Sequence, residues 1–312
     1  MVLPLFNLFE IVDRWPLYRA LRGLGSDECW RVMSELYEID VKEYLQDPDV
    51  LQEYQKTVTE ARIFMRQATA LSSRDIESMA TRFGTYGPRL QFESVFLLLQ
   101  MSDRAKLFDK IVDVQGRDNL VDALGMGNGV LALPVHLGPS YVICPILAHE
   151  NPVTAVFNRI NFDECKTLTF PNLDAEAFSL SSVNVARAGI EALKRGRIFS
   201  IFPEVDPRGV DRNHVRVPFL GTTVMAPVGP VVMSYIAKAP MVPVSLTSNN
   251  DGTFMLKYDE IIMPPKSRDE YMAIVNKLWR ALNSIILNGP TEDWEIWLEF
   301  DKMLPQPSSE EM

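Results

Sequence analysis

The sequence contains few of the residues that build disulfide frameworks and metal centres. Its 312 residues include only three cysteines and three histidines. These residues are unevenly spaced, at Cys29, His136, Cys144, His149, Cys165 and His214. The spacing fits neither a set of disulfides nor a Cys-x2-Cys or histidine metal site. We therefore expect no metal, and we expect the reducing cytoplasm, where free cysteines are usual.

Positive charge is also scarce. The chain has 31 Lys and Arg against 41 Asp and Glu, which gives a net charge of -10. Binding to nucleic acid requires a dominant basic face that neutralises phosphates, so this class of function is excluded. The same acidic balance weakens adhesion to anionic lipid.

No run of residues is apolar enough to span a bilayer, which takes about 20 mostly apolar residues. The N-terminus also lacks the basic start and the small-residue cleavage site of a signal peptide. Its apolar residues instead follow helical spacing and are interrupted by charges; they are Leu5, Leu8, Phe9, Val12 and Trp15. We expect this segment to pack on the core of a soluble, cytoplasmic chain, with at most peripheral membrane contact.

What is present is enough apolar sequence, 47%, to bury a large core. Residues 1–118 predict a helical N-terminal portion, from the spacing of apolar residues and from capping signals. The expected helices run over residues 27–44, 47–70, from 73 onwards, 91–101 and 102–114.

From residue 119 to residue 304 short apolar strands alternate with helices. Strands are expected at residues 130–133, 153–157, 198–202 and 241–246, with an antiparallel edge strand at 254–258. Helices are expected at residues 140–150, 182–194, 229–238 and 268–287. This alternation predicts an α/β fold with a mainly parallel central sheet flanked by helices. Residues 305–312 are expected to form a frayed tail.

Two polar residues follow buried strands in this portion. His136 comes after residues 130–135, and Glu204 comes after residues 198–202. Open sheets of this kind bind ligands beyond the carboxyl ends of their strands, so both residues should lie at that edge. A histidine and a carboxylate at one edge predict a general base and its orienting acid.

A different nucleophile lies close to His136 in the sequence. A helix after Gly138 would place Ser140 and Cys144 on the same face as His136. A Ser-His or Cys-His pair would make the chain a thioesterase or a ping-pong transferase. Core packing is the other explanation for Cys144, and no Gly-x-Ser-x-Gly elbow supports a serine nucleophile.

Basic residues cluster after Glu204 on a segment that we expect to be a loop. They are Arg208, Arg212, His214 and Arg216. Against the acidic background of the chain, this cluster is a candidate site for pantetheine phosphate or for an acidic carrier protein. The alternative is solvated loop charge.

The segment Val135–Tyr141 and several later blocks resemble the lipid A biosynthesis (LpxL/HtrB-like) branch of the glycerolipid-type acyltransferases, over about residues 119–304. The matching positions are Gly138, Val156-Phe157-Asn158-Arg159, Glu204 with Asp206, Val217-Pro218-Phe219-Leu220-Gly221, Pro290, Trp297 and Leu298. Two positions depart from the family. Its His-x4-Asp/Glu motif would put an acid where this chain has Tyr141, and its basic C-terminal run is replaced by Glu299-Phe300-Asp301-Lys302.

The resemblance implies a glycerolipid-acyltransferase-like fold and an enzyme that takes an acyl group from a thioester. The donor would be the phosphopantetheine thioester of acyl carrier protein or coenzyme A, and no permanently bound cofactor is implied. The acceptor would be the amine or hydroxyl of a small molecule or of a carrier-bound group. In this reading the catalytic group is His136 with Glu204 and Tyr141, and the substrate contacts are Gly138, Arg159, Asp206 and Arg208.

The acid missing from the motif leaves three outcomes open. Tyr141 cannot supply a negative charge, since an unperturbed tyrosine has a pKa of ~10. Either Glu204 is the acid partner of His136, or the acceptor is an amine that asks less of the base, or the chain is inactive and only binds acyl groups or carriers. The missing basic run and the acidic charge favour a specialised-metabolite pathway over lipid A. The distance between His136 and Glu204 separates these outcomes.

Overall fold

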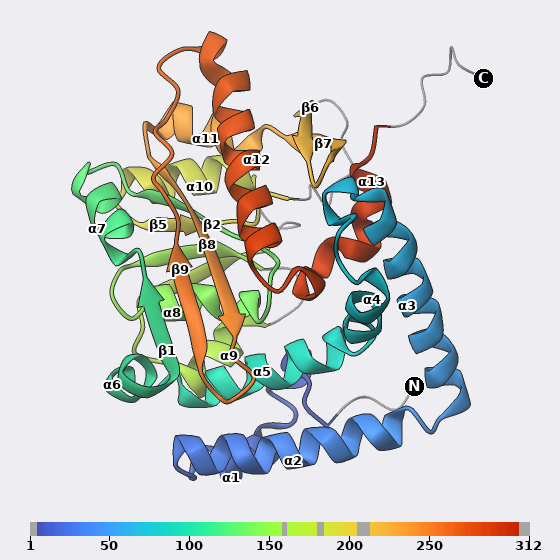
Figure 1. The fold of residues 1–312 in the computed structure, drawn as a ribbon. Helices are drawn as coiled ribbons and strands as arrows, with labels where there is room; N and C mark the ends of the chain where they lie inside the picture. Colours follow the sequence, from blue (N-terminus) through green and yellow to red (C-terminus); the bar gives the residue numbers. More distant parts are fainter. Residues whose placement is uncertain (1–4, 158–160, 180–183, 205–212, 306–312) are drawn as a thin grey trace.

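The computed structural model describes residues 5–157, 161–179, 184–204 and 213–305. Within these ranges seven strands form one sheet, in the order β1-β9-β8-β2-β5-β3-β4 (Figure 1). Their bounds are β1 Val112–Gln115, β2 Val130–Pro134, β3 Val153–Val156, β4 Ala175–Phe178, β5 Ile198–Ser200, β8 Met241–Ser248 and β9 Phe254–Tyr258. Strands β8, β2, β5, β3 and β4 run parallel, and β9 is antiparallel to β8. The predicted α/β fold with a mainly parallel sheet is confirmed.

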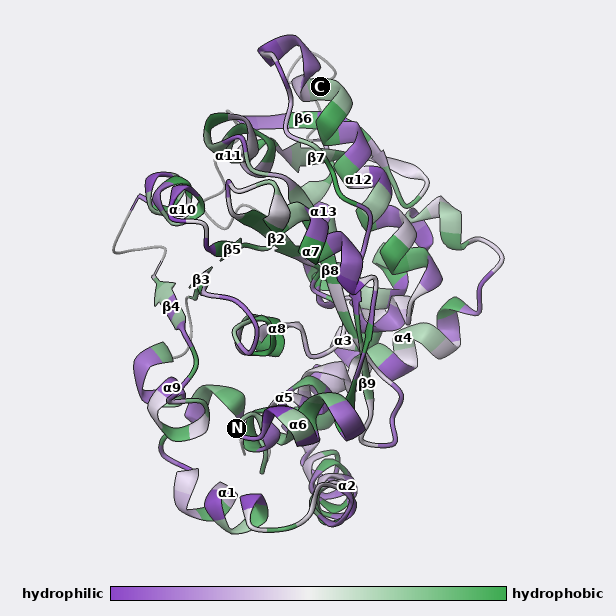
Figure 2. Cartoon of the chain, turned by 90° about the vertical axis from the view of Figure 1, so that its left-hand side faces the viewer, coloured by the Kyte–Doolittle hydropathy of each residue, from purple (hydrophilic) through white to green (hydrophobic). Residues whose placement is uncertain are grey.

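Both faces of the sheet are covered, because its central strands are apolar on both sides. Strand β2 is buried over its whole length, and Figure 2 shows it in the green of hydrophobic residues. Its alternate residues enter different clusters of the core: Val130 and Ala132 enter one, and Leu131 and Leu133 enter the other.

Helices from both halves of the chain complete the two clusters. The first contains residues from α1 Trp15–Arg22, α2 Ser26–Tyr44, α5 Tyr86–Gln100, α7 Arg117–Gly125, α8 Ile143–Leu147 and α9 Phe162–Thr169. The second contains residues from α3 Pro48–Gln67, α4 Ile76–Gly84, α10 Val185–Lys194, α11 Gly229–Ala237, α12 Tyr271–Asn288 and α13 Phe300–Met303. The N-terminal helices therefore share the core of the sheet.

The prediction of a single helix over residues 102–114 is wrong. The segment forms the short helix α6 Arg104–Lys106, a π-helical turn at Leu107–Ile111 and strand β1. Because β1 pairs with the outer side of β9, residues 254–258 do not form the edge strand that we expected. The four residues of β1 alternate over too short a length to be distinguished from the end of an amphipathic helix. The division of the chain at residue 118 stays a prediction.

A hairpin beside the main sheet was also not expected. Strands β6 His214–Phe219 and β7 Thr222–Pro227 pair in antiparallel fashion. Leu220 and Gly221 join them, and both have positive φ, 48° and 80°. This is the backbone of a two-residue hairpin turn. His214 and Arg216 therefore lie on a strand, and not on the loop that the sequence suggested.

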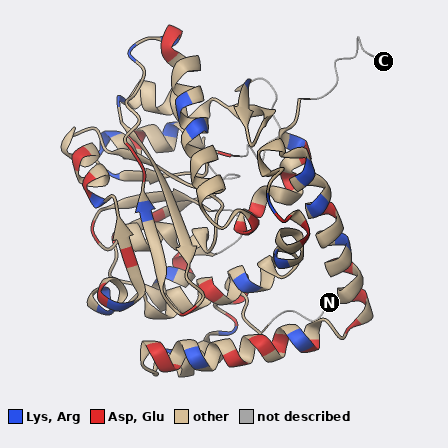
Figure 3. Cartoon of the chain, viewed as in Figure 1, with Lys and Arg blue, Asp and Glu red and all other residues tan. Residues whose placement is uncertain are grey.

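The N-terminal segment packs on the core, as its apolar spacing predicts. Leu8 is buried, and Leu5, Val12 and Trp15 are partly buried against the first cluster. In Figure 3, Lys and Arg are interspersed with Asp and Glu along α2 and α3. Among the described residues, no helix has the length and apolarity that a membrane crossing requires.

A buried carboxyl on α5 makes stability depend on pH. Glu93 is 2% exposed, and burial raises its pKa to about 7, although Arg89 and a hydrogen bond with Ser248 act in the opposite direction. The native state therefore holds this proton to a higher pH than the unfolded chain does. Stability is full below the unfolded pKa and falls as the pH rises through about 7.

We expect Glu93→Gln to remove this decline. The free energy of unfolding of the variant, measured by urea titration at several pH values, should exceed that of the wild type at pH ~8. The difference should be at most a few kcal/mol, since one pKa unit corresponds to ~1.4 kcal/mol. Glu38→Gln makes the same change on an exposed face of α2 and should leave the pH dependence unaltered. Parallel curves for Glu93→Gln and the wild type would contradict the expectation.

Candidate active site

The register of two neighbouring strands brings His136 and Glu204 together. In the pair β2 and β5, Val130 faces Ile198 and Ala132 faces Ser200. Every such pair is 68 positions apart, and the same offset joins His136 to Glu204. The two side chains therefore lie next to each other past the carboxyl ends of the strands, at the edge where open sheets bind ligands.

The Glu204 carboxylate is fully buried and accepts hydrogen bonds from three N–H groups. Its Oε1 accepts from the backbone N–H of His136 at 2.8 Å and from Nε1 of Trp294 at 3.2 Å. Its Oε2 lies 2.9 Å from Nδ1 of His136. The side chain is 0% exposed. The expected contact between histidine and acid is thus present in the structure.

The imidazole of His136 has a defined orientation. A carboxylate only accepts hydrogen bonds, so Nδ1 carries the ring proton and Nε2 carries the lone pair. The ring stacks on Phe202, with the ring centroids 3.8 Å apart, and 15% of the His136 side chain is exposed. A histidine held by an acid at Nδ1, with Nε2 as the basic atom, can act as a general base.

Tyr141 contacts a different acid. Its hydroxyl donates to Oε1 of Glu295 at 2.7 Å, and its ring meets that of His136 edge-on at a centroid distance of 6.5 Å. The other oxygen of Glu295, Oε2, is buried and has no hydrogen-bond partner among the described residues. A second carboxylate thus stands near the histidine, delivered by the C-terminal part of the chain.

The C-terminal segment crosses the histidine segment as a short antiparallel strap. Leu137 and Trp294 form a bridge, the N–H of Gly138 donates to the carbonyl of Asp293 at 3.1 Å, and the N–H of Glu295 donates to the carbonyl of His136 at 2.8 Å. The side chain of Asp293 in turn pairs with Arg89 of α5. These bonds hold the backbone of the His136 segment in place beyond the carboxyl ends of the strands.

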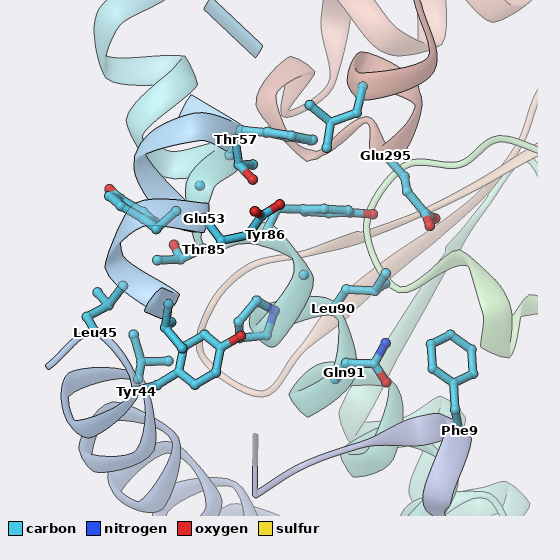
Figure 4. Close-up of a pocket in the computed structure, with 18 of the residues that line it drawn as sticks. Phe9, Tyr44, Leu45, Glu53, Thr57, Thr85, Tyr86, Leu90, Gln91 and Glu295 are labelled. Atoms are coloured by element: carbon cyan, nitrogen blue, oxygen red, sulfur yellow. The ribbon is translucent and has the colours of Figure 1, made fainter. Parts of the chain in front are cut away.

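A cavity of about 330 Å³ opens beside this strap (Figure 4). Residues of α2, α3, α5, the turn Leu8–Glu10 and the turn Glu295–Glu299 surround it. The lining is mostly aromatic and aliphatic, and it includes Phe9, Tyr44, Leu45, Tyr54, Phe83, Tyr86, Leu90 and Leu298. Tyr141 and Glu295 belong both to this lining and to the surroundings of His136. The cavity therefore adjoins residues that contact His136, although His136 itself is not among its described lining residues.

Comparison with known proteins decides the family. Residues 90–304 match the model of the family described as bacterial lipid A biosynthesis acyltransferase. This chain belongs to that family, and it is an acyltransferase. No curated protein matches the sequence. Among solved structures, it is similar to the crystal structure of the 1-acyl-sn-glycerophosphate (LPA) acyltransferase, PlsC, from Thermotoga maritima. The identity is 15%, the TM-score is 0.38, and the match covers 74% of this chain and 97% of that chain.

Three of the predicted substrate contacts of this lipid A-type acyltransferase, Arg159, Asp206 and Arg208, lie outside the described residues. Gly138 is described and lies directly after the His136 segment. Within the described part of the chain, no three His, Cys, Asp or Glu side chains gather in a way that would hold a metal ion.

The alternative nucleophiles of this acyltransferase are poorly placed. The hydroxyl of Ser140 is buried and has no hydrogen-bond partner among the described residues, His136 included. Burial raises the pKa of the Cys144 thiol to about 12, which disfavours the reactive thiolate. Neither residue is prepared for attack.

Two residues at the site, Trp294 and Glu295, were not predicted. They lie between Pro290 and Trp297, two positions that match the family. The sequence therefore indicated that this region resembles the family, but not that it contacts the His136 segment. Their contacts with Glu204 and Tyr141 join positions 90 and 154 residues apart. Only the packing of the strap reveals them.

Gly138 provides a test of the strap. Its φ is +62°, and a Cβ there would lie 2.5 Å from the carbonyl oxygen of Leu246. We expect Gly138→Ala to displace the His136 segment, with a loss of several kcal/mol in the free energy of unfolding and a lower turnover rate. Gly127→Ala is the matched control, because Gly127 also has positive φ, +83°, but open space around it. Left-handed strain alone should cost the control ~1–2 kcal/mol.

Thermal denaturation and thiol-release rates of the two variants check this expectation. The backbone strain is common to both, so the difference between them measures the clash with Leu246. Equal stability and equal rates in the two variants would show that the close approach at Gly138 does not position the site.

Proposed function

We propose that this acyltransferase transfers an acyl group from a thioester carrier to an amine or hydroxyl acceptor, with His136 as the general base. The single observation that carries the proposal is the 2.9 Å contact between Nδ1 of His136 and the buried carboxylate of Glu204. A paired acid of this kind fixes the tautomer of the histidine and stabilises the imidazolium that forms. The paired histidine also favours an active enzyme over a protein that only binds carriers.

The reaction follows from this geometry. The acceptor oxygen or nitrogen attacks the carbonyl carbon of the thioester while Nε2 of His136 takes its proton. Collapse of the tetrahedral intermediate breaks the carbon–sulfur bond. The proton then passes from His136 to the sulfur, so the products are an ester or amide and the free thiol of the carrier.

Glu204 takes the role that the motif gives to position 141. Both oxygens of Glu204 are already held by N–H groups, which leaves the carboxylate no freedom to turn away from the imidazole. Tyr141 is directed to Glu295 instead, and we assign it a positioning role beside the acceptor. This arrangement supports the first of the three outcomes, in which the acid partner has moved to the end of β5.

The donor is proposed to be the phosphopantetheine thioester of acyl carrier protein or coenzyme A. Arg159, Asp206 and Arg208 stay proposed contacts for this donor, with the arginines facing its phosphate or the oxyanion. An acyl carrier protein would be the partner in the first case.

We also propose a cytoplasmic specialised-metabolite pathway in place of lipid A assembly. The free, buried thiols of Cys29, Cys144 and Cys165 fit a reducing compartment. Lys302, the cation of the acidic run that replaces the family's basic block, already pairs with Glu299. A phosphorylated lipid head would therefore meet little positive charge at this place.

Replacing Glu204 tests the proposal. Glu204→Gln keeps the size of the side chain but removes its charge, and we expect turnover to fall by ~10³–10⁴-fold, as when the acid of a histidine–acid pair is lost. The turnover of His136→Ala should decrease by at least the same factor. The measurement is release of free thiol from acyl-coenzyme A and from acyl carrier protein, across a panel of amine and alcohol acceptors. An unchanged rate in Glu204→Gln would exclude the pair as the catalytic unit.

Cys144→Ala and Ser140→Ala separate acyl transfer through His136 from a covalent thioesterase mechanism. We expect both variants to keep turnover within a few-fold of the wild type, because neither side chain is poised for attack. Intact-protein mass spectrometry after mixing with donor should show no acyl adduct. A trapped acyl-enzyme that disappears in one of these variants would replace the proposed mechanism with nucleophilic catalysis.

A further inference from the structure

The cavity beside the strap has a charge pattern that selects among acceptors. Its described lining residues include two carboxylates, Glu53 of α3 and Glu295 of the strap, and none of them is Lys, Arg or His. Neither carboxylate has a cationic partner among the described residues. The nearby arginines Arg82 and Arg89 are engaged elsewhere, with Glu292 and Asp293.

Four tyrosines are prominent among the uncharged polar residues of the lining, which also include Thr57, Thr85 and Gln91. Tyr44, Tyr54, Tyr86 and Tyr141 contribute rings to the cavity, and Figure 4 shows Tyr86 crossing it toward Glu295. Burial raises the pKa of Tyr86 well above its ordinary value, and the charges of Glu295 and Asp293 raise it further. Tyr86 is therefore neutral, and the faces of tyrosine rings attract cations.

Glu295 is the lining residue that lies beside Tyr141. Oε1 accepts the hydroxyl of Tyr141 at 2.7 Å, while Oε2 has no hydrogen-bond partner among the described residues. A buried carboxylate oxygen without a donor is costly, and a cation in the cavity would stabilise the negative charge of this carboxylate. An alcohol would supply only one neutral donor, and an anion would be repelled.

We infer that this cavity binds the acceptor and selects one that carries a protonated amine, separate from the group that attacks the thioester, on an aromatic or apolar body. The inference rests on the proposed transferase function and narrows its acceptor class. The volume of about 330 Å³ is at the lower end of the range for small-molecule sites. Glu295 holds the ammonium group, the tyrosine faces cover the body, and Glu53, a solvent-exposed member of the lining, adds further negative charge.

Binding of three matched probes tests this specificity. Phenethylamine, phenethyl alcohol and phenylacetate share one aromatic body and differ in charge, and isothermal titration calorimetry measures each against the full-length protein. We expect the amine to bind about tenfold more tightly than the alcohol, and phenylacetate not to bind. In Glu295→Gln the preference for the amine should fall by about tenfold, while the affinity for the alcohol should hardly change.

Two further variants complete the design. Glu53→Gln removes the second carboxylate on a different helix and should weaken the amine preference even if Glu295→Gln folds poorly. Glu299→Gln makes the same change at the far end of the turn Glu295–Glu299, outside the cavity lining, and should keep the wild-type preference. Equal affinity for amine and alcohol, no binding of the amine, or a preference that survives in both cavity variants overturns the inference.

Thiol release from lauroyl-coenzyme A, measured on the same preparations, distinguishes this inference from the proposed function. Release that depends on His136 without any preference for the amine would overturn the acceptor pocket alone. Selective amine binding with no release from any thioester would overturn the transferase proposal, and would leave a cation-binding cavity without the transfer step.

Discussion

The buried carboxylate of Glu204 is the constraint on which the rest of the site depends. A single group with no exposure to solvent accepts N–H groups from the end of β2 and from the C-terminal strap, and it contacts the histidine ring. A carboxylate in this position is stable only when its partners stay in place, because an unpaired buried charge is costly. The geometry of the candidate site and the local folding therefore depend on the same set of bonds.

The strap connects the His136 segment to other parts of the acyltransferase. By bonding to the backbone on both sides of Leu137, the segment around Trp294 delivers Glu295 to the vicinity of Tyr141. The same segment ties to α5 through the pair of Asp293 with Arg89. The N-terminal helices thus reach the site through the strap and through the cavity, although the sheet supplies the histidine and its acid.

Much of this fold could be predicted from the sequence because its central strands are uniformly apolar. The strands that contain Val130, Ile198 and Met241 are buried on both faces, and their composition signals this without any knowledge of neighbours. The pairing of His136 with Glu204 followed from the rule that polar residues after parallel strands meet at one edge. Strand β1 could not be predicted in the same way, because it has only four residues. Its partner β9 also lies about 140 positions later in the sequence, so no local pattern indicates the pairing.

The roles of Glu295 and Tyr141 depend on tertiary contacts that no local pattern encodes. In the sequence, Tyr141 marks only the place of a missing acid. In the structure it is a hydrogen-bond donor to a carboxylate 154 positions away. A motif gives the residue type expected at a position. The partner that Tyr141 contacts in place of that residue depends on how the chain packs, which the motif does not contain.

The register between β2 and β5 also determines which changes in chain length the site tolerates. The connection between the two strands includes β3, β4 and helices α8, α9 and α10, and a change of length far from the His136 segment need not alter the pairing of β2 with β5. The critical counts are the two residues from Pro134 to His136 and the four from Ser200 to Glu204. A single insertion in either short segment would turn one member of the pair away from the other, so the length of these two segments is fixed by the contact between His136 and Glu204.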